Sequence, residues 1–411
     1  FLRLRTMASG RTGVRVALAQ SYVDFLNKGI TPVVPEFGSL GCSGDLAPLS
    51  HCALALMGEG RVHDANGVEM ETMQALNAAG IKPIELEAKE GLALINGTDG
   101  MLGMLIMACA DLEQLCMVAD ITTAMSIEGL LGTDRVFAPD LHAPLRPQIG
   151  QAISAANIFA LLKDSGIVAS HRENDSRVQD AYSLRCAPQV AGAVRDTIAY
   201  ASTIAQRELA SSIDNPVVMP DGRVESNGNF HGAPVGYVLD FLAIAATDLG
   251  SMAERRTDRA LDQYRSAGLP PFLAHDPGVD SGLMIAQYTQ AGLVSENKRL
   301  STPASVDSIP SSAMQEDHVS MGWSAARKLR KVVDNLARIL AIELVTAARA
   351  IEFRTGLTPA PATARVVKEL RTVVGGVGPD RFLSPELEAA TALVNSGAVV
   401  AAAKEVVKQL I

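Results

Sequence analysis

Three consecutive residues, Cys42, Ser43 and Gly44, are of the types from which a polypeptide can build an electrophile out of its own backbone. The amide nitrogen of a glycine can fold back onto the carbonyl two residues earlier, because glycine tolerates the strained dihedral angles and the close approach. Loss of water from this ring and from the serine side chain leaves a methylidene group conjugated to a carbonyl. Such a group would need no added cofactor.

The same residues also have a purely structural interpretation. A helix is predicted from Ser43 to about Met57, so Ser43 could be its N-cap and Asp45 an acidic residue of its first turn. The two interpretations are compatible in one respect. The N-terminus of a helix directly behind the ring would stabilise negative charge on a ring oxygen.

The stretch from Gly38 to Leu49 resembles the signature of the aromatic amino acid ammonia-lyases. The resemblance continues in order along almost the whole chain, through Leu94–Thr98, Val178–Cys186, Asn227–Gly232, Ser295–Lys298, Val306–Pro310 and Gln315–Met321. It implies a prosthetic group, 4-methylidene-imidazol-5-one (MIO), formed from Cys42, Ser43 and Gly44 without an external cofactor. Cys42 stands where the family usually has alanine. The ring uses only its backbone carbonyl, so the thiol would remain as a pendant group.

The resemblance also implies roles for residues elsewhere in the chain. Asn96 would hydrogen-bond the MIO oxygen, Tyr182 matches the catalytic tyrosine, and Arg185 would bind the substrate carboxylate with its planar guanidinium. Gln179 and Phe230 would line the pocket. The structural alternatives are an Asn-Gly turn at Asn96, a surface ion pair at Arg185 and a loop-anchoring aromatic at Phe230.

Glu316 is the residue that indicates the substrate. The run Gln315–Met321 is similar to the histidine-directed members of the family, in which a glutamate meets the imidazole end of the substrate. Against a phenyl ring the same carboxylate would be an unpaired buried charge. Alternatively, Ser312–Gln315 forms a capping box, and Glu316 would then lie in the first turn of a helix. His318 is expected to be a packing residue.

The implied reaction is elimination of ammonia from L-histidine to give urocanate, the first step of histidine degradation. The resemblance further implies a cytoplasmic homotetramer with active sites shared between subunits. The family's base is a tyrosine on an N-terminal loop, which would precede Phe1, so the chain is expected to be N-terminally truncated.

Three alternatives differ in function. One is a related MIO lyase or aminomutase acting on phenylalanine or tyrosine. Another is a lyase of the fumarase and aspartase superfamily, whose serine loop continues Met-Pro-x-Lys-x-Asn, whereas Ser311–Met314 continues Gln-Glu-Asp-His. The last is an inactive fragment or helical scaffold that keeps the bundle.

Composition excludes several other classes of function. The 411 residues carry a net charge of −9, which argues against nucleic acid or an anionic membrane as partner. The five cysteines are an odd number without C-x-x-C spacing, which indicates reduced thiols and no metal site. The most apolar stretch, Met101–Ala110, is followed by Asp111 and Glu113, so no transmembrane span is expected.

The predicted fold class is all-α, with a long central helix bundle and a loop-rich, MIO-bearing N-terminal part. We expect residues 1–105 to form this part, incomplete at its start, and residues 106–411 to form the bundle and C-terminal helices of one continuous subunit. Long helices are predicted over residues 102–131, 189–211, 232–265 and 312–353, and a hairpin-like turn over 62–68. The last helix is apolar nearly all round, which predicts burial in a bundle or an oligomer core.

Overall fold

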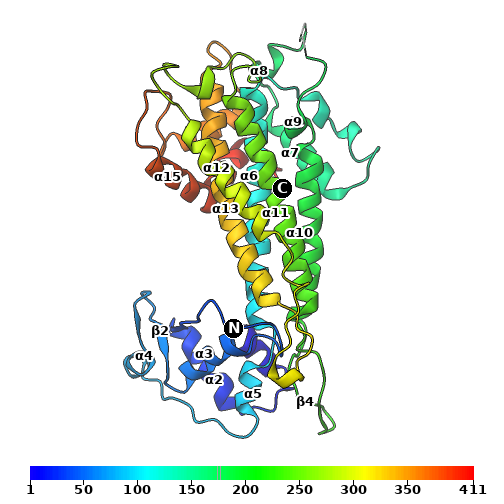
Figure 1. Cartoon of the computed structure of the whole chain (residues 1–411), viewed down its shortest axis with the longest axis vertical. Coiled ribbons are helices and arrows are strands. Elements are labelled where there is room, and N and C mark those ends of the chain that lie inside the picture. Colours follow the sequence, from blue (N-terminus) through cyan, green and yellow to red (C-terminus); the bar gives the residue numbers. More distant parts are fainter. Residues whose placement is uncertain (174, 176) are drawn as a thin grey trace. The chain divides into compact units, whose positions relative to one another are not determined.

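The elements of the chain fall into two units in the computed structural model, which describes residues 1–173, 175 and 177–411 (Figure 1). Unit 1 consists of residues 1–107, 201–240 and 303–328, and unit 2 of residues 108–200, 241–302 and 329–411. Each unit is therefore assembled from separate stretches of sequence. The predicted division into residues 1–105 and 106–411 consists of continuous segments, whereas each unit combines three stretches of sequence.

Unit 1 holds five short helices and two small sheets. The helices are α1 (Leu2–Ala8), α2 (Val16–Asn27), α3 (Leu46–Leu56), α4 (Thr72–Ala79) and α5 (Glu90–Ile95). Strands β1 (Thr31–Pro32), β2 (Arg61–His63) and β3 (Glu69–Glu71) form an antiparallel sheet in that order, and β4 (Val217–Val218) pairs with β5 (Val224–Glu225). The pairing of β2 with β3 confirms the hairpin-like turn predicted over 62–68.

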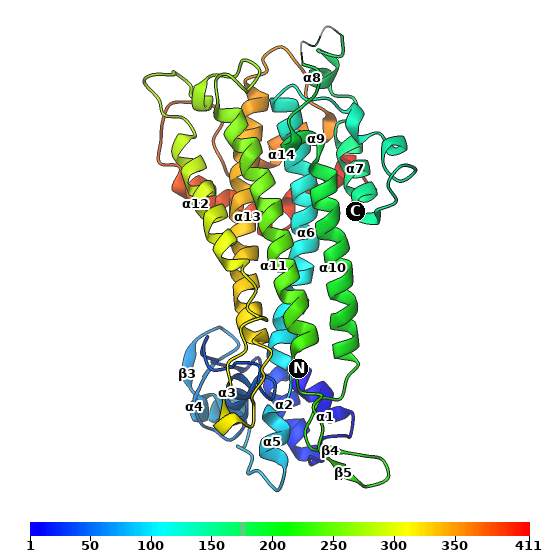
Figure 2. The ribbon, with the colours of Figure 1, turned by 45° about the vertical axis from the view of Figure 1, so that its right-hand side comes forward.

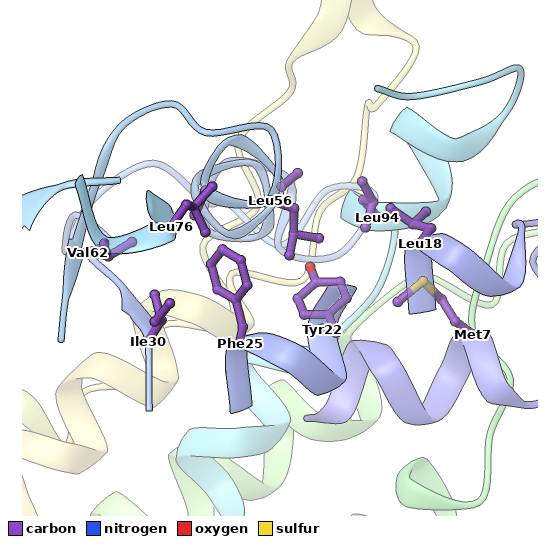
Figure 3. Close-up of a cluster of buried hydrophobic side chains, with 12 residues drawn as sticks. Met7, Leu18, Tyr22, Phe25, Ile30, Leu56, Val62, Leu76 and Leu94 are labelled. Carbon is purple, nitrogen blue, oxygen red and sulfur yellow. The ribbon is translucent and has the colours of Figure 1, made fainter. Parts of the chain in front are cut away.

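A cluster of buried apolar side chains holds the short helices of unit 1 together (Figure 3). Leu18, Tyr22 and Phe25 lie on one face of α2 because they are spaced four and three residues apart. They pack with Leu56 of α3 and Leu94 of α5. Since α3 begins just after Gly44 and α5 ends just before Asn96, this cluster fixes two of the elements next to the candidate electrophile.

Most of unit 2 is helical. Its elements, several of which begin or end in unit 1, are α6 (Asp99–Gly129), α7 (Ile149–Leu161), α8 (Gly166–Ala169), α9 (Tyr182–Arg185), α10 (Ala187–Leu209), α11 (Ala233–Leu261), α12 (Met284–Leu300), α13 (Gly322–Glu352), α14 (Pro361–Leu370), α15 (Ser384–Asn395) and α16 (Ala398–Val406). Short 3₁₀ turns lie at Arg135–Phe137, Pro139–Leu141 and Pro271–Leu273. The predicted all-α class with long central helices is confirmed.

A buried ion pair ties three of the long helices together within unit 2. Arg256 on α11 and Glu343 on α13 are each 1 % exposed and form a two-point contact, in which Nη2 donates to Oε2 at 2.9 Å. Thr122 and Ser126 on α6 donate to the same carboxylate at 2.8 and 3.0 Å. The charge of Glu343 is thus fully compensated, as a buried carboxylate requires. Figure 2 shows these helices side by side.

Helix α13 is buried on nearly all sides by the chain itself. Val332, Leu336, Ile339, Leu340 and Leu344 are inaccessible to solvent in the single chain. The predicted burial is confirmed, and the bundle alone provides it. The apolar circumference of α13 therefore no longer argues for an oligomer.

Two sequence predictions about helix starts are wrong. The helix predicted over 312–353 begins ten residues later, at Gly322, and residues 312–314 form a separate turn. In addition, α3 begins at Leu46 with Asp45 as its N-cap, so Ser43 is not the capping residue.

The expectation that no helix is long and apolar enough to cross a membrane is also wrong by composition. Two helical stretches pass that test, residues 90–129 and Ala233–Leu261. About half of the first and three fifths of the second is buried inside the protein. The core helices of a water-soluble bundle have the same character, so these two are weak evidence for a membrane.

Candidate active site

A buried aspartate anchors the loop that carries the candidate electrophile. Asp45 is inaccessible to solvent. It accepts hydrogen bonds from the Met101 amide at 2.8 Å and from the Ser39 hydroxyl at 3.2 Å. Burial raises the pKa of Asp45 to about 7, since it penalises the charged form more than these donors stabilise it. The sequence places Asp45 in a first turn but does not reveal this burial.

Gly44 occupies a position that only glycine fits. Its φ is +80°, in the left-handed region, and a Cβ atom there would lie 2.2 Å from the carbonyl oxygen of Gly97. That carbonyl also accepts a hydrogen bond from the Asp45 amide at 2.8 Å. The backbone at Gly44 is therefore pressed against the Asn96-Gly97 turn, which brings two of the predicted site segments together.

The Ser43 side chain points to a carboxylate that is distant in sequence. Its hydroxyl donates to Oε1 of Glu316 at 3.1 Å. The hydroxyls of Ser311 and Ser312 donate to Oε2 of the same residue at 2.8 and 2.7 Å. These donors, Ser312 first, lower the pKa of Glu316, so the carboxylate is ionised at neutral pH. Glu316 serves here as an acceptor for hydroxyl groups and does not cap a helix, so the capping alternative is wrong.

A left-handed turn sets the position of Glu316. Ser312, Ala313 and Met314 all have positive φ, at 50°, 54° and 70°. The turn is closed by the backbones of Ser311 and Glu316, whose amides donate to each other's carbonyl at 3.0 and 3.4 Å. Three successive non-glycine residues in this region are costly, and such strain is typical of functional sites.

The thiol of Cys42 lies at the edge of this network. Its Sγ is 3.4 Å from the hydroxyl of Ser311, which itself contacts Glu316. Burial, and to a smaller degree the Glu316 carboxylate, raises the pKa of Cys42. The side chain is therefore a protonated thiol at neutral pH, consistent with a pendant group and not with a nucleophile.

Asn96 is connected to the turn of Phe230 through Asn215, which is not among the predicted site residues. The buried Asn96 donates from Nδ2 to the carbonyl of Asn215 at 2.7 Å, and Asn215 accepts the Asn227 amide at its side-chain oxygen at 2.9 Å. Asn227 begins the turn that holds the half-buried Phe230. No signal in the sequence marks Asn215 beyond its place before a proline.

The amide group of Asn96 is only partly used. Its Oδ1 is buried and has no hydrogen-bond partner among the described residues. Nδ2 carries two hydrogens, of which the contact with Asn215 takes one. A buried amide with unused hydrogen-bonding capacity beside Gly97 and Gly44 is suited to binding a further polar group.

Tyr182, Arg185 and Gln179 belong to unit 2. Tyr182 and Arg185 begin and end the single-turn helix α9, and the guanidinium carbon lies 4.7 Å from the centre of the tyrosine ring. Tyr182 is 70 % exposed, while Nε of Arg185 is buried without a hydrogen-bond partner among the described residues. Gln179 lines a polar hollow together with Arg177 and Arg259. The surface ion pair considered for Arg185 is not formed among the described residues.

The long helices are those that the resemblance to a known family implied, and comparison with known proteins identifies the same family. The model of the aromatic amino acid lyase family matches residues 1–372. The chain therefore belongs to the aromatic amino acid lyase family.

The chain is similar to several individual members of this family. The chain is 68 % identical over 407 residues to the histidine ammonia-lyase of Streptomyces coelicolor, covering 99 % of this chain and 79 % of that protein. Among solved structures it resembles histidine ammonia-lyase from Trypanosoma cruzi, with a TM-score of 0.90 and 40 % identity over 98 % of this chain and 77 % of the other. It is equally similar to tyrosine aminomutase from Streptomyces globisporus, with a TM-score of 0.91 and 40 % identity over 98 % and 79 %.

Proposed function

We propose that the protein is an ammonia-lyase that eliminates ammonia from L-histidine to give urocanate, the first step of histidine degradation. The observation that carries this proposal is the contact between Ser43 and Glu316, 3.1 Å from hydroxyl to carboxylate. It sets an ionised acceptor beside the residue at which the electrophile would form. The 68 % identity to a histidine ammonia-lyase supports the same substrate.

The residues present fit the prosthetic group of the family. Gly44 has a positive φ and no space for a Cβ next to Gly97, so it is the glycine that backbone cyclisation requires, and Asn96 has unused hydrogen-bonding capacity beside it. When formed, the MIO would supply an electrophile that takes up the substrate amine and makes it a better leaving group. Cys42, Ser43 and Gly44 would provide its atoms, and the second N–H of Asn96 would hold its oxygen.

Glu316 and Arg185 would orient the substrate through its two polar ends. An ionised carboxylate can accept a hydrogen bond from the imidazole N–H of histidine, whereas a phenyl ring has no donor and would leave the carboxylate desolvated and unpaired. The guanidinium of Arg185, whose Nε is free of partners among the described residues, can bind the substrate carboxylate in a bidentate manner. Phe230 and Gln179 would line the pocket, and we keep Tyr182 as a catalytic residue because its phenol is accessible.

We further propose a homotetramer with shared active sites, located in the cytoplasm. Four large apolar side chains of unit 2 are about half exposed in the single chain, namely Phe241, Ile244, Ile285 and Tyr288. Large exposed apolar side chains on neighbouring helices support a contact with another chain. All five cysteines are free, which supports a reducing compartment. Light scattering of the purified protein tests the tetramer by mass.

A second candidate is a tyrosine aminomutase, since the chain resembles that fold as closely as the histidine enzyme from Trypanosoma cruzi. The two candidates differ in product. A lyase releases ammonia and an unsaturated acid, whereas an aminomutase returns the amine to the neighbouring carbon. The identity of 68 % to a histidine ammonia-lyase, against 40 % to the tyrosine aminomutase, favours the lyase acting on histidine.

The test is a product analysis with three substrates. We expect the full-length protein, with the N-terminal loop that the resemblance implies, to form urocanate and an equal amount of ammonia from L-histidine. We expect no cinnamate or coumarate from L-phenylalanine or L-tyrosine, and no β-amino acid. The Ser43→Ala variant is the matched control, since it lacks only the hydroxyl from which the electrophile would form. Formation of β-tyrosine, or of cinnamate in place of urocanate, would overturn the proposal.

A further inference from the structure

Two histidines in unit 1 form a pair that none of the site assignments uses. His231 directly follows Phe230, and His318 lies two residues after Glu316. Their rings are stacked with centroids 5.4 Å apart and planes inclined by 21°, and Nδ1 of His318 is 3.3 Å from Nε2 of His231. His318 is exposed, so it is not the core packing residue that the sequence analysis predicted.

The contacts of His231 determine which ring nitrogens carry hydrogen. Its Nδ1 accepts the amide hydrogen of Ala233, the first residue of α11, at 3.3 Å. A neutral imidazole has one donor and one acceptor nitrogen, so Nε2 of His231 carries the hydrogen. That nitrogen then donates to Nδ1 of His318. The pair is thus a directed chain from the N-terminus of α11, through His231, to His318.

The segment from Glu316 to Ser320 has further points of attachment besides the side chain of Glu316. The backbone of Glu316 pairs with Ser311, the Val319 amide donates to the hydroxyl of Ser308 at 2.9 Å, and the Ser320 hydroxyl donates to the Gly41 carbonyl at 3.0 Å. The contact from His318 to His231 is the attachment that joins this segment to the turn of Phe230.

The start of α11 is pressed closely against the same segment. A Cβ atom on Gly232 would lie 2.6 Å from Sδ of Met101 and 3.0 Å from the hydroxyl of Ser320. The backbone on either side of the pair therefore has little freedom to shift. The contact between the two rings adds a side-chain link across this junction, between the chain at Glu316 and the chain at Phe230.

We propose that His231 and His318 are positioning residues that hold Glu316 beside position 43, where the electrophile would form, and keep Phe230 at the same site. Neither imidazole touches a reacting atom in this role. The kinetic consequence rests on the proposed function, because it acts through the carboxylate that would bind the imidazole of the substrate. Loss of the pair weakens ground-state binding of L-histidine and leaves the chemical step largely intact, so KM changes more than kcat.

Matched amide variants test the pair at His318. The side-chain oxygen of asparagine falls near the position of a histidine Nδ1, whereas the amide of glutamine falls near Nε2. His318→Asn therefore keeps the acceptor and His318→Gln removes it. We expect His318→Gln to raise KM for L-histidine about three- to tenfold, the range of one net hydrogen bond, with kcat within about twofold. We expect His318→Asn to stay within about twofold of the wild type.

Asparagine and glutamine also test His231, but here glutamine is the variant that keeps the hydrogen bond between the two side chains. His231→Gln keeps the donor to His318, whereas His231→Asn keeps only the acceptor for the Ala233 amide. We expect His231→Asn to reproduce the KM increase of His318→Gln, and the double variant to be no worse than either single one. His275→Gln, on an exposed loop, is the control and should leave KM unchanged.

Three results would overturn the proposal: an unchanged KM in His318→Gln, an equal KM increase in His318→Asn, or additive effects in the double variant. The emission of Trp323, the single tryptophan, verifies that unit 1 is folded in each variant. The coupling is also measured in the urea unfolding midpoints of the wild type, His318→Gln, His231→Asn and the variant with both substitutions, and this measurement does not depend on activity. If the wild type forms no urocanate, the proposed function fails, and these midpoints still decide whether the two rings are coupled.

Discussion

The hydroxyl of Ser43 donates a hydrogen bond to the carboxylate of Glu316 at 3.1 Å, although 273 residues separate the two in sequence. One of these residues is the proposed source of the electrophile, and the other is the proposed acceptor for the imidazole of the substrate. Their contact places both functions within one unit of the chain. It also makes each residue testable by a substitution that leaves the other in place.

Replacing Glu316 by glutamine should impair binding of histidine specifically. Glu316→Gln keeps the size of the side chain and removes its charge. A hydrogen bond to a charged group contributes about 1.5–3 kcal/mol, so we expect kcat/KM for L-histidine to fall about 10- to 100-fold, mainly through KM. Steady-state rates of urocanate formation measure this. Asp317→Asn removes a charge from the exposed neighbour and should change kcat/KM little. Equal effects of the two variants would contradict the role of Glu316.

Replacing Ser43 by alanine should abolish the modification of the chain. Formation of the MIO from Cys42, Ser43 and Gly44 removes two molecules of water, so the intact wild-type protein should be lighter than its sequence by that amount. Ser43→Ala should lack the loss of water from the side chain and show no lyase activity. Ser50→Ala, which removes a hydroxyl bonded to a helix carbonyl, should keep the full mass loss. A wild-type mass equal to that of the unmodified sequence would contradict the prediction.

Features that depend on neighbouring residues could be predicted from the sequence. Cys42, Ser43 and Gly44 are consecutive, and the long helices follow from apolar patterns that extend over many turns. What the sequence could not supply is the contact between Ser43 and Glu316, or the bridge through Asn215, because no local pattern encodes which distant segments pack together.

Residues 312–315 show how a local pattern can mislead. Ser312 followed by Gln315 satisfies the capping-box rule, yet residues 312–314 adopt left-handed dihedral angles and α13 begins at Gly322. The competing interaction is long-range. Glu316 takes hydroxyl donors from Ser43, Ser311 and Ser312, and these contacts favour the left-handed turn over a helical start.

The strain in this turn can be measured with a glycine substitution. Ala313 has a φ of 54°, and an alanine in the left-handed helical region costs roughly 1–2 kcal/mol. Glycine removes this cost but loses about 0.5–1 kcal/mol of backbone entropy. We expect Ala313→Gly to raise the free energy of unfolding by about 0.5–1 kcal/mol, measured by urea unfolding.

A second alanine provides a control, in which the same substitution should change the free energy of unfolding in the opposite direction. Ala401 is exposed within α16, where glycine is less favourable than alanine by about 1 kcal/mol. Ala401→Gly should therefore lower the free energy of unfolding. If Ala313→Gly also lowers it, the turn at Ser312–Met314 is not strained at Ala313 in the way that its dihedral angles indicate.

The buried carboxyl of Asp45 should make stability depend on pH. Its pKa is raised by burial from an ordinary value of 3.8 to about 7. Below about pH 4 both the folded and the unfolded state carry the proton. Between that pH and about 7 only the unfolded state releases it, so stability falls as the pH rises through this range. We expect the stabilising contribution of the protonated form to be full below about pH 4, only partly lost at pH 5, and lost at pH 8.

Asp45→Asn should remove this dependence, because an amide can accept the Met101 amide hydrogen and contact the Ser39 hydroxyl without titrating. The melting temperature of the variant minus that of the wild type should therefore be larger at pH 8 than at pH 5. Asp64→Asn is the control. Backbone amides, that of Val68 first, lower the pKa of Asp64, so its stabilising charge is lost only in more acidic solution and the comparison of pH 5 with pH 8 should not change. If Asp45→Asn shifts the melting temperature equally at both pH values, Asp45 is ionised in the folded protein throughout this range.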